Sequence, residues 1–208
     1  EQIEIELENP EIWNNQDNAQ ELATNMIKHK VNIIMDLSGI DDRSKQEIAS
    51  RFIDTIIEDR DESPPIQLFI EEASRFAKKG DASAINIKCT GSLKKTAQFG
   101  RKRQLSTFYN TQRITQLHKD IVAECNTKIL GRVDDIADVN RLCEIAGIKD
   151  GSIFRKLKYE FLAKGVGFDH DETNQSVKFK SEPTNSRHLK STKRARNSHP
   201  KPNDHVKE

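Results

Sequence analysis

Two adjacent carboxylates stand at the end of a short apolar run. Glu71 and Glu72 follow Ile66–Ile70, in which four of the five residues are apolar. Ligands of parallel sheets bind beyond the carboxyl ends of the strands. There, one carboxylate can hold a magnesium ion, usually through water, and the next can orient or deprotonate an attacking water. Paired acids also end many strands as solvated or helix-capping residues, so this short motif alone leaves both interpretations open.

Two further side chains suit phosphate chemistry. Gln112 follows the run Leu105–Tyr109, and in a parallel sheet it would lie beside the tip of the Glu71 strand. A neutral amide there can hydrogen-bond a γ-phosphate and a lytic water, although a polar turn is the simpler interpretation. Arg101 ends a predicted helix, where it either complements the negative helix end or reaches a nucleotide bound by a neighbouring subunit. Spacing does not decide between these two roles.

Short apolar runs alternate with helical patterns along the chain, and this order must position those side chains. We expect strands at 3–7, 31–37, Ile66–Ile70, Leu105–Tyr109 and Thr127–Leu130, with short strands around 165–168 and 177–179. We expect helices at 18–29, from Asp42 to about 57, at 92–103 and at 135–146, the last closed by Gly147. The pattern predicts an α/β fold with a mostly parallel sheet, strands buried on both faces and helices on both faces.

The carboxy-terminal end differs in composition from the rest. From Lys178 onward there are nine Lys/Arg against three Asp/Glu, although the whole chain has a net charge of only +1. We therefore divide the chain into an α/β part at 1–180 and a basic, disordered tail at 181–208. Nucleic-acid phosphates are candidate ligands of four tail residues: Lys190, Lys193, Arg194 and Arg196. A merely solubilising tail explains the same charges equally well.

Several classes of protein are disfavoured. No run of 18 apolar residues occurs and the amino terminus has no apolar signal segment, so no membrane partner is expected. The three cysteines, Cys89, Cys125 and Cys143, are scattered, which argues against a disulfide framework or a zinc site. A reducing, cytoplasmic location fits this pattern.

Taken in order, the motifs resemble the HerA–FtsK superfamily of P-loop ATPases, closest to its HerA branch. The segments that carry the resemblance are 31–42, 66–76, 100–102, 110–113 and 125–132, within a match from about Val31 to Gly167. Each motif is loose, but all five occur in the family's order with helices and strands between them.

The resemblance implies a RecA-like, ATP-hydrolysing DNA translocase or helicase that forms a hexameric ring and uses ATP and Mg²⁺. It leaves a nuclease or other effector open as a further partner. By motif position, Glu71 resembles the magnesium-side acid, where the family usually has Asp, and Glu72 resembles the water-activating acid. Gln112 resembles the polar sensor, and Arg101 resembles the arginine offered across a subunit boundary. Arg132, at the end of the next strand, is a weaker candidate for a phosphate or interface contact.

The phosphate-binding loop of that family is missing. No G-x-x-x-x-G-K-[ST] occurs in the 208 residues, and family order would place it before Glu1. Either the chain is the carboxy-terminal part of a longer motor, which its start at Glu1 rather than Met favours, or it is a degenerate member. In the second case it would serve as a non-catalytic module for assembly or DNA tethering.

Overall fold

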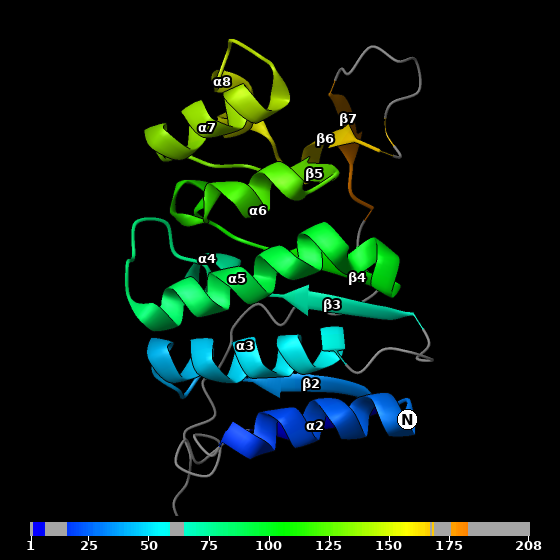
Figure 1. The fold of residues 1–208 in the computed structure, drawn as a ribbon. Helices are drawn as coiled ribbons and strands as arrows, with labels where there is room; N and C mark the ends of the chain where they lie inside the picture. The colour runs from blue at the N-terminus through cyan, green and yellow to red at the C-terminus, as the bar shows by residue number, and fades with distance from the viewer. Residues whose placement is uncertain (1, 7–15, 59–64, 167, 169–175, 183–208) are drawn as a thin grey trace, which may run out of the picture.

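The computed structural model describes residues 2–6, 16–58, 65–166, 168 and 176–182 (Figure 1). The strands are β1 (Gln2–Glu6), β2 (Asn32–Asp36), β3 (Ile66–Ile70), β4 (Leu105–Tyr109), β5 (Thr127–Leu130), β6 (Glu160–Gly165) and β7 (Val177–Lys180). The α-helices are α2 (Gln16–His29), α3 (Asp42–Glu58), α4 (Ala73–Phe76), α5 (Ala84–Phe99), α6 (Lys119–Glu124), α7 (Ile136–Ala146) and α8 (Ser152–Lys156). Two 3₁₀ turns, η1 (Gly100–Arg103) and η2 (Ile114–Gln116), flank β4. Within these residues no helix is long and apolar enough to cross a membrane.

The strands pair in three sets. β1 pairs with β2 and β3 pairs with β4, both in parallel, whereas β5, β6 and β7 form an antiparallel sheet in that order. In the second pair Ile66 lies opposite Leu105 and Ile70 lies opposite Tyr109, so β3 and β4 end side by side. The predicted α/β class with parallel strands is confirmed, and the register brings the residues after β3 next to those after β4.

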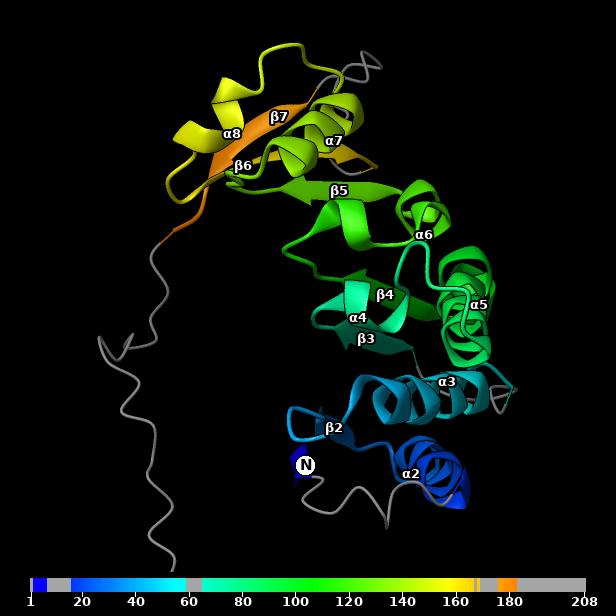
Figure 2. The ribbon, with the colours of Figure 1, turned by 90° about the vertical axis from the view of Figure 1, so that its left-hand side faces the viewer.

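The helices that connect the parallel strands gather on one side of them. β2, β3, β4 and β5 follow one another in space in chain order, and α2, α3, α5 and α6 all lie on the same side (Figures 1 and 2). Crossovers between parallel strands are right-handed, so the side on which the connecting helix lies depends on whether the next strand is added to the left or to the right of the previous one. Strands that are added in the same direction therefore have their connecting helices on the same side.

The other side of these strands is open within the described residues. Its exposed apolar side chains are Ile34, Phe69, Phe108 and Ile129, one from each of β2 to β5. Phe69 is 64% exposed and stacks on Phe108 with ring centroids 4.6 Å apart. The expectation that the strands are buried on both faces was therefore wrong for these residues.

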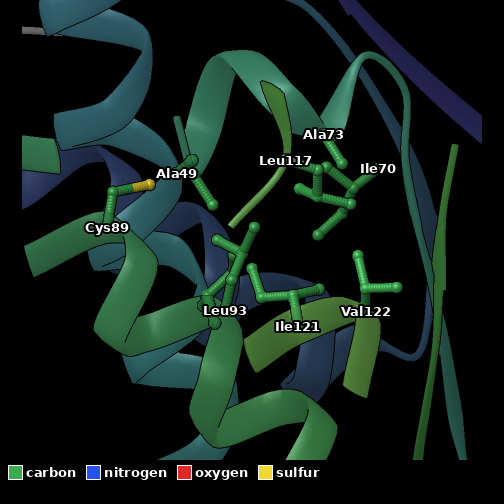
Figure 3. Close-up of a cluster of buried hydrophobic side chains, with 10 residues drawn as sticks. Ala49, Ile70, Ala73, Cys89, Leu93, Leu117, Ile121 and Val122 are labelled. Atoms are coloured by element: carbon green, nitrogen blue, oxygen red, sulfur yellow. The ribbon is translucent and has the colours of Figure 1, made fainter. Parts of the chain in front are cut away.

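Two cores hold the described residues together near the candidate site. The first lies between α3, β3, α5 and α6, where Ile70, Leu93 and Ile121 meet (Figure 3). The second lies between β5, β6, α7 and α8 around the fully buried Phe154. The end of β4 and the loop after it lie between the two cores, since Ile114 packs against both.

Most predicted elements are present, and the differences have local causes. β3, β4 and β5 have the predicted bounds, and α7 begins after its N-cap Asp135 and ends at Gly147, whose φ is 74°. α5 begins at Ala84, not at Ser92, because the Ser83 hydroxyl accepts the N–H of Asn86 and caps the helix.

Other bounds moved or were missed. α2 begins at Gln16 instead of Asn18, and β6 spans Glu160–Gly165 where a strand was expected at 165–168. The short helices α4, α6 and α8 were not predicted. Residues 183–208, with Lys190, Lys193, Arg194 and Arg196, lie outside the described residues, so the tail and the division at residue 180 remain predictions.

Candidate functional site

The carboxylate pair lies directly at the carboxyl end of β3. Glu71 is exposed, and Glu72, which is half-buried, is the residue before α4. The backbone of Glu72 has φ 51° and ψ 45°, a left-handed conformation that costs an L-residue with a side chain roughly 1–2 kcal/mol. Lys30, Gln104 and Tyr159 are left-handed as well, so this conformation alone does not mark a functional site, and the contacts that hold it distinguish the turn at Glu72.

Asn110, the first residue after β4, provides those contacts. Its backbone N–H donates to the Ile70 carbonyl at 2.9 Å, and its carbonyl accepts the Ala73 N–H at 2.8 Å. Its side-chain amide donates to Oε2 of Glu71 at 2.7 Å. Asn110 therefore bridges the turn that holds both carboxylates and orients the first of them. No separate role for Asn110 was predicted from the sequence, although Asn110 begins the segment 110–113 that contains Gln112.

Gln112 lies at the same edge as the carboxylates. It is exposed, in the turn between β4 and η2, two residues after Asn110. The Thr111 hydroxyl accepts the backbone N–H of Arg113 at 3.2 Å and closes this turn around Gln112. The structure thus brings Glu71, Glu72 and the loop of Gln112 together, as the pairing of β3 with β4 requires.

Arg101 lies at the opposite end of the same strands. It is exposed in η1, which immediately precedes β4, and Gln104 of that connection accepts the Ile66 N–H at the start of β3. The four residue steps of β4 amount to about 13 Å between the two edges. Gly100 lets the turn pack tightly, since a Cβ there would lie 2.5 Å from the Leu105 carbonyl oxygen. Arg101 is therefore not part of the cluster formed by Glu71, Glu72 and Asn110 in its own chain.

Arg132 borders the site from the next strand. It follows β5, is exposed, and its guanidinium lies 3.4 Å from a carboxylate oxygen of Asp134. The next residue, Asp135, lies 3.8 Å from Arg113, so the turns after β4 and β5 are neighbours. This contact places Arg132 near the edge that holds Gln112 but gives it no contact with the carboxylate pair.

The donors at this edge fit part of a magnesium–phosphate site. Carboxylate oxygens are ligands that Mg²⁺ accepts, usually with several waters retained, and Glu71 and Glu72 offer them. Among the described residues no group of three or more His, Cys, Asp or Glu side chains forms a complete protein cage. The 208 residues also contain no G-x-x-x-x-G-K-[ST] loop to hold phosphates. The edge fits the acidic half of such a site.

Comparison with solved structures gives the fold a precedent. The genome packaging NTPase B204 from Sulfolobus turreted icosahedral virus 2 matches with a TM-score of 0.56 in its complex with AMPPCP, at 14% identity over 78% of this chain and 72% of that one. Its complex with ATP-gammaS matches with a TM-score of 0.52, at 14% identity over 77% and 72%.

A further B204 structure, from Sulfolobus turreted icosahedral virus and described as the DNA-packaging ATPase, matches with a TM-score of 0.54, at 13% identity over 77% of this chain and 71% of that one. The chain matches no family model and no curated protein. At this identity the likeness concerns the fold, and the chain has the α/β fold of these packaging NTPases.

Proposed function

We propose that this chain supplies the water-activating half of an ATP site in a HerA–FtsK-type motor that forms a ring and moves DNA. The observation that carries the proposal is the joined end of β3 and β4, where Asn110 holds Glu71 and the strained turn at Glu72. The fold shared with packaging NTPases that were solved with ATP analogues supports it.

Each residue at this edge has a distinct task in the proposal. A bound magnesium ion would neutralise developing phosphate charge, and Glu71, oriented by Asn110, would hold it through water. Glu72 would accept a hydrogen bond from the attacking water and take its proton. The amide of Gln112 would hydrogen-bond the γ-phosphate and that water without adding charge.

The open side of the strands suggests where the phosphate-binding half belongs. β4 and β5 are not hydrogen-bonded to each other within the described residues, and each carries an exposed apolar side chain, Phe108 on β4 and Ile129 on β5. A strand placed between β4 and β5 would pair with both. If the chain returned from this strand toward β2, a right-handed crossover would place the connecting helix over the open side of the strands. We propose that residues outside these 208 provide this strand, the phosphate-binding loop and the helix.

Arg101 enters the proposal through a second subunit. Because it lies at the other end of β4 from Glu72, it can serve a nucleotide only when that nucleotide is bound by a neighbouring chain. A head-to-tail interface of this kind forms a ring when the rotation between subunits closes, and the proposal requires such closure. A hexameric ring with DNA in its channel is the assembly that the family resemblance suggests, and Arg132 would stand near the nucleotide in such an interface.

The test of the proposal is Glu72→Gln in the natural protein that contains this chain. Loss of the base should lower ATP hydrolysis by roughly two or more orders of magnitude while ATP binding, measured by calorimetry, is retained. Glu58→Gln is the matched control, since Glu58 is an exposed glutamate at the end of α3, and it should leave kcat unchanged. Equal kcat in the Glu72→Gln variant and the wild type would refute the role of Glu72.

The alternative is a non-catalytic module for assembly or DNA tethering, which the missing phosphate-binding loop favours. ATP-binding measurements on the isolated 208 residues do not distinguish the motor from the non-catalytic module, because we expect weak or no ATP binding in either case. Micromolar ATP affinity of the isolated chain would contradict the proposed division of the site. DNA binding by the natural protein without any ATP hydrolysis would favour the alternative.

A further inference from the structure

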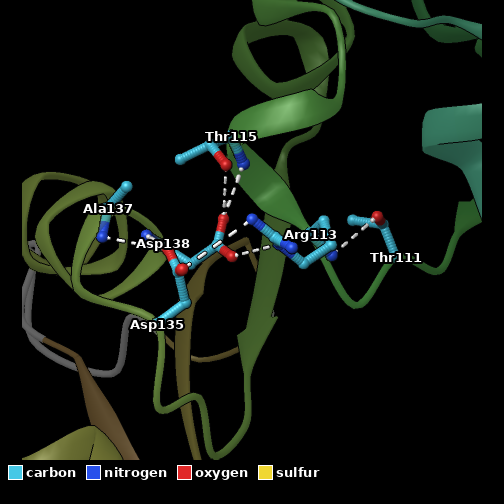
Figure 4. Close-up of polar contacts among 6 residues, drawn as sticks. All are labelled: Thr111, Arg113, Thr115, Asp135, Ala137 and Asp138. Carbon is cyan, nitrogen blue, oxygen red and sulfur yellow. Dashed lines mark hydrogen bonds and ion pairs between the residues drawn. The ribbon is translucent and has the colours of Figure 1, made fainter.

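One buried carboxylate lies just outside the site. Asp138, in the first turn of α7, is 1% exposed. Its Oδ2 accepts a hydrogen bond from Nε of Arg113 at 2.8 Å. Its Oδ1 accepts two from Thr115, one from the backbone N–H at 2.9 Å and one from the hydroxyl at 2.7 Å. Figure 4 shows all three donors converging from the loop after β4 onto one side chain of α7.

The partners of Asp138 explain how its charge is tolerated in the interior. Burial raises the pKa of Asp138, but the hydrogen bonds from Thr115 and then from Arg113 outweigh burial and hold the pKa below its usual value. Arg113 also lies 3.8 Å from Asp135, the N-cap of α7. The guanidinium is therefore held between two carboxylates at the start of α7, which is a strong link because both partners are charged.

The loop is tied at its other end as well. Asn110 is bonded to the turn after β3 through its backbone and its side chain. Between these two anchors Gln112 is exposed, and within the described residues no hydrogen bond to its side chain is present. The backbone on either side of Gln112, and not a contact of the amide itself, therefore determines where that amide lies.

We propose that Asp138 is the positioning residue for the loop at 110–116 and thereby for Gln112. The link also joins the two cores, because α7 packs with β5 and β6 while β4 belongs to the parallel pair. A displacement of α7 would consequently carry Arg113 and Gln112 with it. The role of Gln112 in hydrolysis rests on the proposed function, whereas the anchoring of the loop does not.

Hydrogen exchange on the 208-residue chain tests the anchoring directly. Asp138→Asn keeps the shape, but its single neutral amide oxygen can accept from Thr115 or from Arg113, so the other donor faces an N–H₂ group. Amide exchange in 110–116 should accelerate about tenfold or more, while exchange in α3 and α5 changes less than about twofold. Asp150→Asn is the matched control, since Asp150 accepts from Ser152 in an exposed turn, and it should leave 110–116 unchanged. Unchanged exchange in Asp138→Asn would overturn the proposal.

The hydrogen bond between positions 113 and 138 can also be restored with two uncharged side chains. Arg113→Gln combined with Asp138→Asn allows one amide to donate to the other, so the double variant should recover part of the protection lost in Asp138→Asn. Additive losses would show that the two side chains do not act as a pair and would overturn the anchoring by Arg113. If Asp138→Asn fails to fold, as shown by circular dichroism, Thr115→Val removes one bond alone and should accelerate the same segment.

In the natural protein, the kinetics of Asp138→Asn distinguish a role in positioning Gln112 from a role in binding ATP. Asp138→Asn should lower kcat for ATP about tenfold with KM changed less than about twofold, because Gln112 acts on the attacking water. An equal rise in KM with kcat retained would contradict the positioning role. If the wild-type protein hydrolyses no ATP, the proposed function fails, and the exchange experiment still decides whether Asp138 anchors the loop.

Discussion

The two ends of β3 and β4 differ in how firmly they hold their polar side chains. At the carboxyl end, Asn110 is bonded to three groups of the neighbouring turn, and Glu72 is held in a left-handed conformation. At the amino end the backbone is tied as well, since Gln104 is left-handed with φ 53° and accepts the Ile66 N–H, but within the described residues the exposed side chain of Arg101 has no hydrogen-bond or ion-pair partner. Chemistry that demands fixed geometry therefore belongs to the carboxyl end of this chain. At the amino end, the exposed guanidinium of Arg101 is available for a contact with a second molecule.

Among the polar side chains, the largest effect on the stability of the isolated chain should come from Asp138, the anchor beside the carboxyl end. Because the folded pKa of Asp138 lies below its unfolded value of about 3.9, its contribution is present above about pH 4 and is lost as the pH falls through the folded pKa. Asp138→Asn should lower the free energy of unfolding by about 2 kcal/mol at pH 7. In urea titrations the difference from wild type should shrink below pH 4. A difference that is independent of pH would show that the ionised carboxylate is not the source of the stability.

A smaller effect is expected at Asn110. Asn110→Ala removes the amide that donates to Glu71 but leaves both backbone bonds to Ile70 and Ala73. In the natural protein ATP hydrolysis should fall about tenfold, and the Mg²⁺ concentration for half-maximal rate should rise. Asn126→Ala, in the turn before β5, is the control. An unaltered dependence of the hydrolysis rate on Mg²⁺ concentration in Asn110→Ala would show that Glu71 does not hold the metal ion.

The smallest effect should come from the open side of β3. Phe69 is 64% exposed and stacks on Phe108, so Phe69→Thr should change the free energy of unfolding of the 208-residue chain by no more than about 1 kcal/mol. Ile70, the next residue, is 9% exposed in the first core, and Ile70→Ala should cost about 2–4 kcal/mol. In the natural protein the proposed helix would cover Phe69, so the cost of Phe69→Thr should rise there. An equally small cost in both proteins would argue against that helix.

The sequence was sufficient for the strands at the centre of the site. Ile66–Ile70 is a short, mostly apolar run after two prolines, and Leu105–Tyr109 is a short segment with aromatic and β-branched residues between polar neighbours, so both were identified with the observed bounds. Parallel pairing then predicted Glu71 and Gln112 at one edge, and the structure adds that Arg101 lies at the other. These conclusions depend only on chain order and strand direction.

What the sequence did not reveal depends on contacts between distant residues. Asn110 and Glu71 are 39 positions apart, and Asp138 and Arg113 are 25 apart, so no local pattern marks either pair. α5 was predicted to begin eight residues too late, because its first half lacks a clear apolar stripe. The Ser83 cap was a local signal that could have identified its start. The open side of the strands was not predicted, because an apolar run in the sequence predicts a buried strand but does not show which element covers that strand.

The measurement that tests the central claim most directly is ATP hydrolysis by mixed rings of Glu72→Gln and Arg101→Ala subunits of the natural protein. Each variant alone should be nearly inactive, by roughly two or more orders of magnitude for Glu72→Gln and about three for Arg101→Ala. In randomly mixed rings, about one interface in four joins an intact Glu72 to an intact Arg101. Hydrolysis should therefore return to a substantial fraction of the wild-type rate once native mass spectrometry shows that mixed rings form. Mixed rings that hydrolyse ATP no faster than either variant alone would contradict the division of the site between the two ends of β4.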